Sequence, residues 1–175
     1  VTSESLFNIA SCTKPFTSAA IGLLVQKGKI NWNDRVIDYL PELKLKDPYI
    51  TRELTIADIL SHRSGLTTFT GDLLWYNTDY TNEEIIQRME FLPIENEFRA
   101  DFGYQNNMFM IAGEIIERVS GMTWSKFITK NLFRPLKMTS SKPSNDELID
   151  EDELAHPHLN GKQVDLYDFN GTKPA

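Results

Sequence analysis

The sequence has one cysteine and no long run of apolar residues, and these two shortages limit the kind of protein it encodes. A single cysteine, Cys12, excludes a disulfide within the chain. A membrane-spanning helix needs about 18 or more apolar residues, and no stretch reaches that length. The longest candidate, residues 19–25, reads as the buried side of an amphipathic helix. We therefore expect no membrane span in this chain.

Basic residues are also scarce, since 18 Lys and Arg face 25 Asp and Glu and the net charge is -7. Affinity for nucleic acid comes mainly from Lys and Arg, so no nucleic-acid partner is expected. The chain has no recognisable signal peptide, but it begins without a methionine, so this absence does not decide its localisation. A length of 175 residues with 41% hydrophobic composition is typical of one globular domain with a core.

Apolar residues at helical spacing predict that the chain is mainly α. The first run starts at Thr13 and ends before Gly28, with Pro15 near its start, where a missing N–H does no harm. Further helical patterns fill residues 108–119 and follow the capping residues Thr55, Thr81 and Thr123. Only a weak pattern at 163–169 resembles a strand.

Ser11 and Lys14 form a Ser-x-x-Lys pattern at the start of the first predicted helix. Residues three apart share one face of a helix, so the lysine amine can reach the serine hydroxyl. Chance alone supplies about one such match in a chain of this composition, and a plain capping serine with an exposed lysine is the alternative. This is the single match in the sequence, and it falls where unpaired helical N–H groups favour negative charge. We predict that Ser11 is a nucleophile activated by Lys14.

A nucleophilic serine of this kind needs a second proton carrier, and Tyr104 with Asn106 is the candidate that we prefer. Two residues apart in an extended turn, a phenol and an amide point to the same side. Tyr80 and Asn82 have the same spacing and remain an alternative. We prefer the later pair because Thr81 serves better as a helix cap.

Other patterns are weaker. His156 and His158 place two imidazoles together, but no further ligand stands at a convincing spacing, so neither a metal nor another cofactor is expected. His62 lies two residues before Ser64, and we predict that it forms a hydrogen bond that fixes its loop. Gly-x-Ser-x-Gly, the nucleophile elbow of another hydrolase class, is absent.

Five segments carry a resemblance when they are taken in order: residues 7–17, 28–34, 60–66, 102–106 and 135–138. Together they resemble the serine β-lactamase-related hydrolases of the class C type. This family includes class C β-lactamases, D-alanyl-D-alanine carboxypeptidases, D-aminopeptidases and related esterases. Five motifs in one order are far more specific than one tetrapeptide, and the similarity spans nearly the whole chain.

The resemblance implies that Ser11 forms an acyl-enzyme, that Lys14 and Tyr104 move its proton, and that Asn106 binds the substrate amide. Whether the lysine or the tyrosine is the base stays open. The expected partner is a small-molecule or peptide substrate: a β-lactam, a D-amino-acid amide or an ester. A penicillin-binding sensor without turnover is the alternative. The family also implies a periplasmic or extracellular location.

One departure from the family is that its third element, Lys-Thr-Gly or His-x-Gly on a sheet strand, is absent. We therefore expect residues 1–175 to be an incomplete domain. It would be the helical portion of the α+β β-lactamase/transpeptidase-like fold, with most of the antiparallel sheet missing. In the family that sheet supplies one oxyanion N–H, so the chain by itself is expected to be inactive or impaired. It is also expected to self-associate through its exposed sheet-facing surface.

Overall fold

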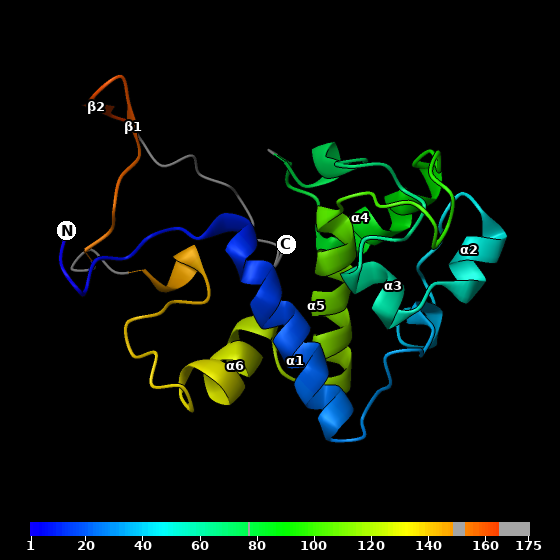
Figure 1. Cartoon of the computed structure of the whole chain (residues 1–175), viewed down its shortest axis with the longest axis horizontal. Coiled ribbons are helices and arrows are strands. Elements are labelled where there is room, and N and C mark those ends of the chain that lie inside the picture. The colour runs from blue at the N-terminus through cyan, green and yellow to red at the C-terminus, as the bar shows by residue number, and fades with distance from the viewer. Residues whose placement is uncertain (77, 149–152, 165–175) are drawn as a thin grey trace.

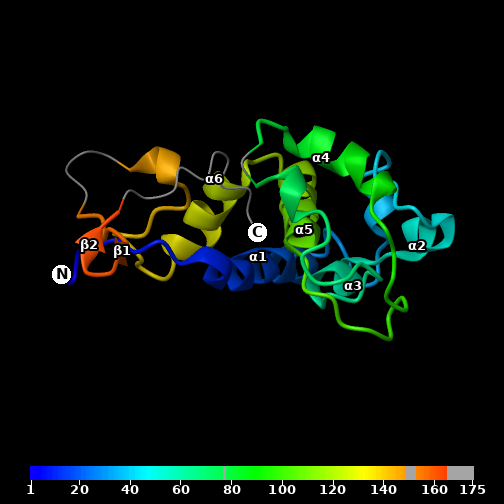
Figure 2. The ribbon, with the colours of Figure 1, turned by 90° about the horizontal axis from the view of Figure 1, so that it is seen from above.

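Two long helices form the centre of the molecule. The computed structural model describes residues 1–76, 78–148 and 153–164. Helices α1 (Lys14–Gln26) and α5 (Asn106–Ser120) lie side by side, as Figures 1 and 2 show. Gly121 ends α5 with a φ of 68°, a left-handed conformation that glycine adopts without steric cost. Both long helices predicted from the apolar periodicity are confirmed.

Shorter helices pack around this pair. Three of them follow the predicted caps: the Thr55 and Thr81 side chains each form a capping box, and Thr123 accepts a hydrogen bond from the Lys126 N–H. The predicted helix after Thr123 becomes π-helical at Thr129–Phe133. One further helix was not predicted, although it has a capping aspartate and a proline in its first turn. The short helices are α2 (Pro48–Glu53), α3 (Ile56–Leu60), α4 (Asn82–Arg88) and α6 (Trp124–Ile128).

Within the described residues, five 3₁₀ turns connect or extend these helices, and two of them hold residues of the site described below. They are Ala10–Thr13, Val36–Asp38, Asp72–Leu74, Met89–Phe91 and Asn145–Glu147.

The hydrophobic core lies between α1, α3, α5 and α6. Helix α5 is buried along most of its length, and α1 turns Ala20, Ile21 and Leu24 toward it. Ile56 and Ile59 of α3 pack into the same cluster. Each fully buried aliphatic side chain stabilises the fold by about 1.5–3 kcal/mol. This packing fixes the start of α1 relative to the start of α5, which is where the site forms.

The sheet content of the described residues is one small hairpin. Strands β1 (His158–Leu159) and β2 (Lys162–Gln163) pair antiparallel, with His158 opposite Gln163. Asn160 and Gly161 have φ values of 52° and 76°, the left-handed conformations that a tight Asn-Gly hairpin turn requires. The chain is thus mostly helical, as expected. Gln163 of the predicted strand lies in β2, whereas residues 165–169 lie outside the described residues.

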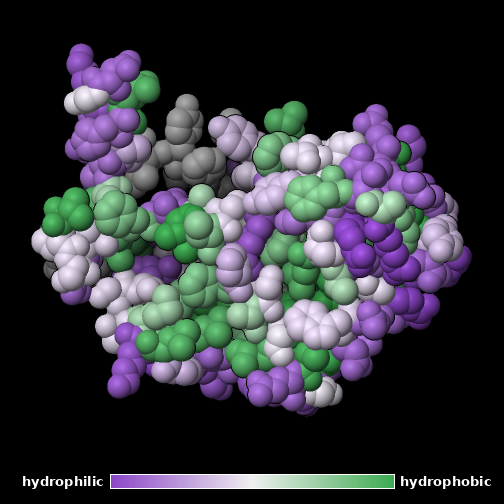
Figure 3. Space-filling model, viewed as in Figure 1, coloured by the Kyte–Doolittle hydropathy of each residue, from purple (hydrophilic) through white to green (hydrophobic). Residues whose placement is uncertain are grey.

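The surface carries apolar side chains between polar ones (Figure 3). Phe7 and Ile9, in the segment that enters α1, are 59% and 48% exposed. Within the described part of the chain, no helix is both long enough and apolar enough to cross a bilayer.

Candidate active site

Ser11 lies in the 3₁₀ turn that leads into α1, and its side chain is exposed. The preceding residue, Ala10, has a φ of 45°, which is uncommon for a residue other than glycine. Strained backbone of this kind is concentrated at functional sites, where the surrounding structure holds it. The turn presents the serine hydroxyl at the edge of the helix bundle.

Lys14 is only 6% exposed, although it carries an amine. Its Nζ donates hydrogen bonds to Ser11 Oγ at 3.2 Å and to Asn106 Oδ1 at 2.7 Å. The same nitrogen lies 4.9 Å from the ring centre of Tyr104 and 5.4 Å from that of Phe109. The predicted contact between Lys14 and Ser11 is thus present, and two aromatic rings help to enclose the amine.

Tyr104 approaches the serine from a distant segment of the chain, just before α5. Its hydroxyl donates to Ser11 Oγ at 2.7 Å across 93 residues of chain. Burial by itself would raise the pKa of Tyr104, but hydrogen bonding to Lys14 and Ser11 outweighs it and lowers the pKa below its ordinary value of 10.0. The backbone at Gly103 allows this approach, because a Cβ there would lie 1.9 Å from the Leu66 carbonyl oxygen.

Asn106 begins α5 and links the lysine to a further residue. Its Oδ1 accepts from Lys14, and its Nδ2 donates to Asp72 Oδ2 at 2.9 Å. The alternative pair has other contacts: Asn82 Nδ2 donates to Glu114, and the Arg88 guanidinium lies over the Tyr80 ring. The structure therefore brings Tyr104 and Asn106 to Ser11.

Asp72 is the site residue that the sequence did not reveal. Besides its contact with Asn106, its Oδ1 accepts from Trp75 Nε1 at 3.3 Å. Burial raises the pKa of this carboxyl above its ordinary value of 3.8, against the opposing effect of Asn106, Trp75 and Lys14. Asp72 and Asn106 are 34 residues apart and belong to no recognisable motif, so no spacing in the sequence indicates the contact.

His62 fixes its loop by a hydrogen bond, as predicted. Its Nδ1 accepts the Gln105 backbone N–H at 3.0 Å, and its ring stacks on Tyr104 with 4.7 Å between ring centres. Burial and, secondly, the charge of Lys14 lower the pKa of His62 below its ordinary value of 6.5. The neutral ring is therefore the form that supports the tyrosine.

We expect protonation of His62 to destabilise the fold. Because the folded-state pKa lies below 6.5, the unfolded chain binds the proton more readily. The stabilisation is complete above pH 6.5 and is lost as the pH falls from there to the folded-state pKa. Melting temperatures measured from pH 7.5 to pH 5, at steps of about half a unit, test this.

The test variant for this measurement is His62→Asn, and the control is His156→Asn. Asparagine tolerates the left-handed φ of 59° at this position and offers an oxygen to the Gln105 N–H, but it does not titrate. We expect this variant to lose part of the pH dependence, whereas His156→Asn, at an exposed histidine, should keep all of it. An unchanged pH dependence in His62→Asn would contradict the role of His62.

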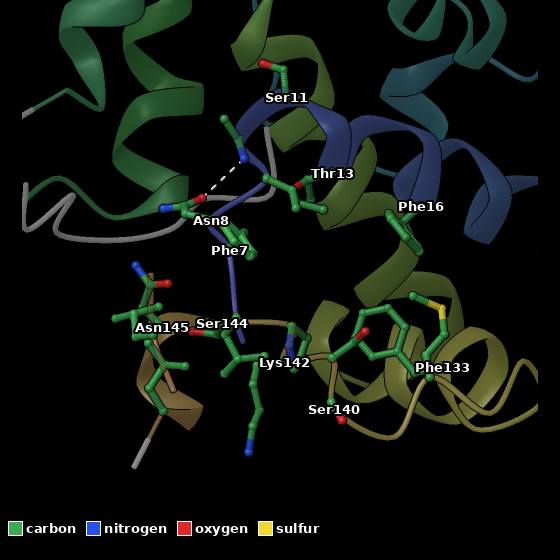
Figure 4. Close-up of a pocket in the computed structure, with 18 of the residues that line it drawn as sticks. Phe7, Asn8, Ser11, Thr13, Phe16, Phe133, Ser140, Lys142, Ser144 and Asn145 are labelled. Atoms are coloured by element: carbon green, nitrogen blue, oxygen red, sulfur yellow. Dashed lines mark hydrogen bonds between the residues drawn. The ribbon is translucent and has the colours of Figure 1, made fainter. Parts of the chain in front are cut away.

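A pocket of about 760 Å³ opens beside Ser11, within the range of about 300–1,000 Å³ usual for small-molecule sites. Figure 4 looks into it, with Ser11 at one end and Ser140, Lys142 and Ser144 toward the other. A hydrogen bond from the Ala10 N–H to Asn8 Oδ1, at 3.2 Å, braces the wall next to the serine. Much of the lining is apolar and includes Phe7, Ile9, Phe16, Trp124, Phe133 and Met138.

The described residues offer no metal site, because no three His, Cys, Asp or Glu side chains among them are grouped to hold an ion. His158 Nδ1 instead lies 3.0 Å from the backbone oxygen of His156. A serine hydroxyl with an amine and a phenol within hydrogen-bond distance can lose its proton to the neutral amine or to the phenolate and attack an electrophilic carbonyl.

Comparisons with known proteins identify the family of this chain. The Beta-lactamase family model matches residues 1–173. Penicillin-binding protein 4* of Bacillus subtilis (strain 168) is 31% identical over 174 residues, which are 94% of this chain and 37% of that protein. Unguisins hydrolase ungD' of Aspergillus campestris is 30% identical over 178 residues, covering 96% of this chain and 33% of the hydrolase. The chain thus spans about a third of the length of these relatives.

Solved structures show the same fold. D-amino acid amidase from Ochrobactrum anthropi SV3 superposes with a TM-score of 0.75 at 27% identity, covering 91% of this chain and 47% of the amidase. An octameric penicillin-binding protein homologue from Pyrococcus abyssi has a TM-score of 0.69 at 27% identity, over 87% of this chain and 36% of that one. Since the family model covers nearly every residue, the chain belongs to the Beta-lactamase family, whose relatives include penicillin-binding proteins and D-amino acid amidases.

Proposed function

We propose that the protein carrying this chain is a serine hydrolase that forms an acyl-enzyme on Ser11. One observation carries the proposal: Ser11 Oγ accepts hydrogen bonds from both Lys14 Nζ, at 3.2 Å, and Tyr104 OH, at 2.7 Å. In the first step the serine oxygen bonds to the substrate carbonyl carbon, and its proton passes to the basic member of this pair, the neutral amine or the phenolate. The pair then returns the proton to the leaving group as the bond between that group and the carbonyl carbon breaks, and water hydrolyses the acyl ester.

Lys14 and Tyr104 act on the serine proton together in this proposal. Their contact couples the two groups, so one proton is shared between them and does not belong to either alone. The lowered pKa of Tyr104, which reflects hydrogen bonding to Lys14 and Ser11 against the effect of burial, makes the phenolate, the form that can accept a proton, easier to reach. Asn106 holds the lysine through Oδ1, and its amide N–H is the group we assign to the substrate carbonyl.

The substrate class is an amide, a β-lactam or an ester of a small molecule or peptide. Relatives named as a D-amino acid amidase and an unguisins hydrolase support hydrolysis, and a penicillin-binding relative supports β-lactam recognition. The apolar pocket beside Ser11 suits an apolar side chain on the acyl group. By analogy with penicillin-binding relatives, we expect the protein to act outside the cytoplasm.

We propose further that residues 1–175 need additional sheet structure for full activity, and that by themselves they self-associate. The exposed apolar side chains Phe7 and Ile9 at the pocket support this, as does the octameric assembly named for one similar structure. An isolated 175-residue chain that remains monomeric and turns substrate over as fast as a longer protein carrying it would contradict this proposal.

Intact-mass analysis with a fluorophosphonate probe and with a β-lactam tests the nucleophile. We expect one adduct on the wild-type protein and none on Ser11→Ala. Ser18→Ala, which removes a hydroxyl from α1, the helix that follows the turn of Ser11, is the control and should label like the wild type. An adduct that persists in Ser11→Ala would exclude Ser11 as the nucleophile.

The same experiment separates an enzyme from a penicillin-binding sensor. A hydrolase releases the β-lactam product and returns to its original mass, whereas a sensor stays acylated. We expect the acylated protein to return to its original mass when intact-mass measurements are repeated after addition of the β-lactam.

A further inference from the structure

We propose that Asp72 is a positioning residue, which holds the Asn106 side-chain amide with its oxygen toward Lys14. The proposal concerns the geometry between these three side chains. Only its kinetic consequence rests on the proposed function of Ser11.

Hydrogen-bond chemistry permits one orientation of this amide. Lys14 Nζ has protons to donate, and it lies 2.7 Å from Asn106 Oδ1. On the other side, Asp72 Oδ2 accepts from Asn106 Nδ2 at 2.9 Å. A flipped amide would set two donors against each other at the lysine and two acceptors against each other at the aspartate. Asp72 therefore selects the orientation that offers an oxygen to Lys14.

The carboxylate is itself held in place by its own turn. Gly71, immediately before it, has a φ of 86°, and a Cβ there would lie 2.6 Å from the Leu92 side chain and 2.7 Å from that of Asn107. Only glycine fits this conformation and this space. Trp75 Nε1 then donates to Asp72 Oδ1, so both carboxylate oxygens have partners.

The loop that carries Asp72 is also tied to the segment that carries Tyr104. The Phe69 N–H donates to the Tyr104 carbonyl at 2.9 Å, and the Tyr104 N–H donates to Thr68 Oγ1 at 3.1 Å. Gln105 Nε2 donates to the Thr67 carbonyl from the same segment. These bonds hold the segment of Asp72 against the segment of Asn106, so the contact between the two side chains is preorganised.

The charge of Asp72 also complements that of Lys14. The titratable groups that act on this carboxylate are Lys14, from α1, and the Tyr104 phenol, from the segment before α5. Its hydrogen-bond partners Asn106 and Trp75 are neutral. A negative charge beyond the asparagine polarises the amide, which strengthens the hydrogen bond that its oxygen accepts from the lysine. The amide has two N–H groups, and the one not bonded to Asp72 remains for a substrate carbonyl.

Side-chain amide NMR tests the geometry without any requirement for activity. The Asn106 Nδ2 resonances are assigned by their loss in Asn106→Ala. We expect them to shift with pH in the wild type as Asp72 is protonated, and to lose that shift in Asp72→Asn. Asp79→Asn removes a similar charge from an exposed position on the same connection and should keep the wild-type shift. Resonances that titrate alike in wild type and Asp72→Asn would overturn the proposal.

The rate of fluorophosphonate labelling at Ser11 tests the consequence. Asp72→Leu, which offers no acceptor, is expected to label about 10- to 100-fold more slowly, by analogy with the loss of residues that orient metal ligands. Asp79→Asn should label at the wild-type rate. In the wild type, protonation of Asp72 is expected to slow labelling at low pH. Asp72→Asn is expected to lose this fall in the labelling rate, whereas a purely structural role of Asp72 would leave it in place. Equal rates and profiles in all variants would overturn the kinetic role.

Failure of the two proposals can be told apart. If the wild type takes up no probe at Ser11, the nucleophile assignment is wrong, and the Asn106 resonances still decide the role of Asp72.

Discussion

Lys14→Met is expected to slow acylation of Ser11 by about 10²- to 10⁴-fold, the usual contribution of a positioned acid or base. The amine donates to Ser11 Oγ and to Asn106 Oδ1, and methionine offers no proton to either. Methionine has a similar length and suits the buried space beside Tyr104 and Phe109, so the fold should survive. Labelling rates with the fluorophosphonate probe, followed by intact mass, measure the loss.

The matched control is Lys27→Met, at the other end of the same helix, where the amine donates to Asn131 Oδ1 on the surface. It should label at the wild-type rate. The circular dichroism spectrum and melting temperature of both variants show whether folding is retained. A folded Lys14→Met protein that labels as fast as the wild type would remove Lys14 from the mechanism and leave Tyr104 as the proton acceptor.

Asp58→Ala is expected to lower the free energy of unfolding by about 3 kcal/mol, the low end of the range for breaking a buried ion pair. The Asp58 side chain is 1% exposed and binds Arg63 at 2.9 Å and Arg99 at 2.8 Å. It also completes the capping box of α3 with Thr55. We expect a loss at the low end of this range because both arginine side chains are more than 40% exposed and become better hydrated once Asp58 is removed.

Urea unfolding at neutral pH measures this change. Asp38→Asn, at the exposed pair with Arg35, is the control and should change stability by no more than about 0.5 kcal/mol. The pH dependence gives a second check. Burial would raise the pKa of Asp58, but Arg99 and Thr55 hold it below 3.8. The stabilisation is therefore present above pH 3.8 and is lost as the pH falls through the folded-state pKa.

This ion-pair cluster matters to the site because Arg99 belongs to the segment that leads to Tyr104. Its bond to Asp58 spans 41 residues and ties that segment to α3. His62 lies two residues past the end of α3. Its ring accepts a hydrogen bond from the Gln105 N–H and stacks on Tyr104. Equal stability of Asp58→Ala and Asp38→Asn would show that the cluster does not hold these elements together.

The elements that the sequence predicted well are those with local causes. The helix at α1 follows from apolar spacing and from Pro15 and Gly28, and the caps at Thr55 and Thr81 satisfy N–H groups only a few residues away. The contact of Lys14 with Ser11 is of the same kind, since three residues along a helical turn bring the two side chains together.

Contacts between distant residues required the folded chain. Tyr80 and Tyr104 have equivalent spacing to an asparagine, and only the packing of α5 against α1 places the second of them at Ser11. Asp72 had no detectable signal, because its role depends on a glycine turn and an asparagine 34 residues away.

The amino-acid sequence by itself determined most of the helices, the Ser11–Lys14 pair and the family, because local sterics, capping and ordered motifs are properties of neighbouring residues. Only the tertiary structure decided which tyrosine reaches the serine and which carboxylate orients Asn106. The reason is physical: a hydrogen bond acts over about 3 Å, and only the packed core brings residues so far apart in the chain to that distance.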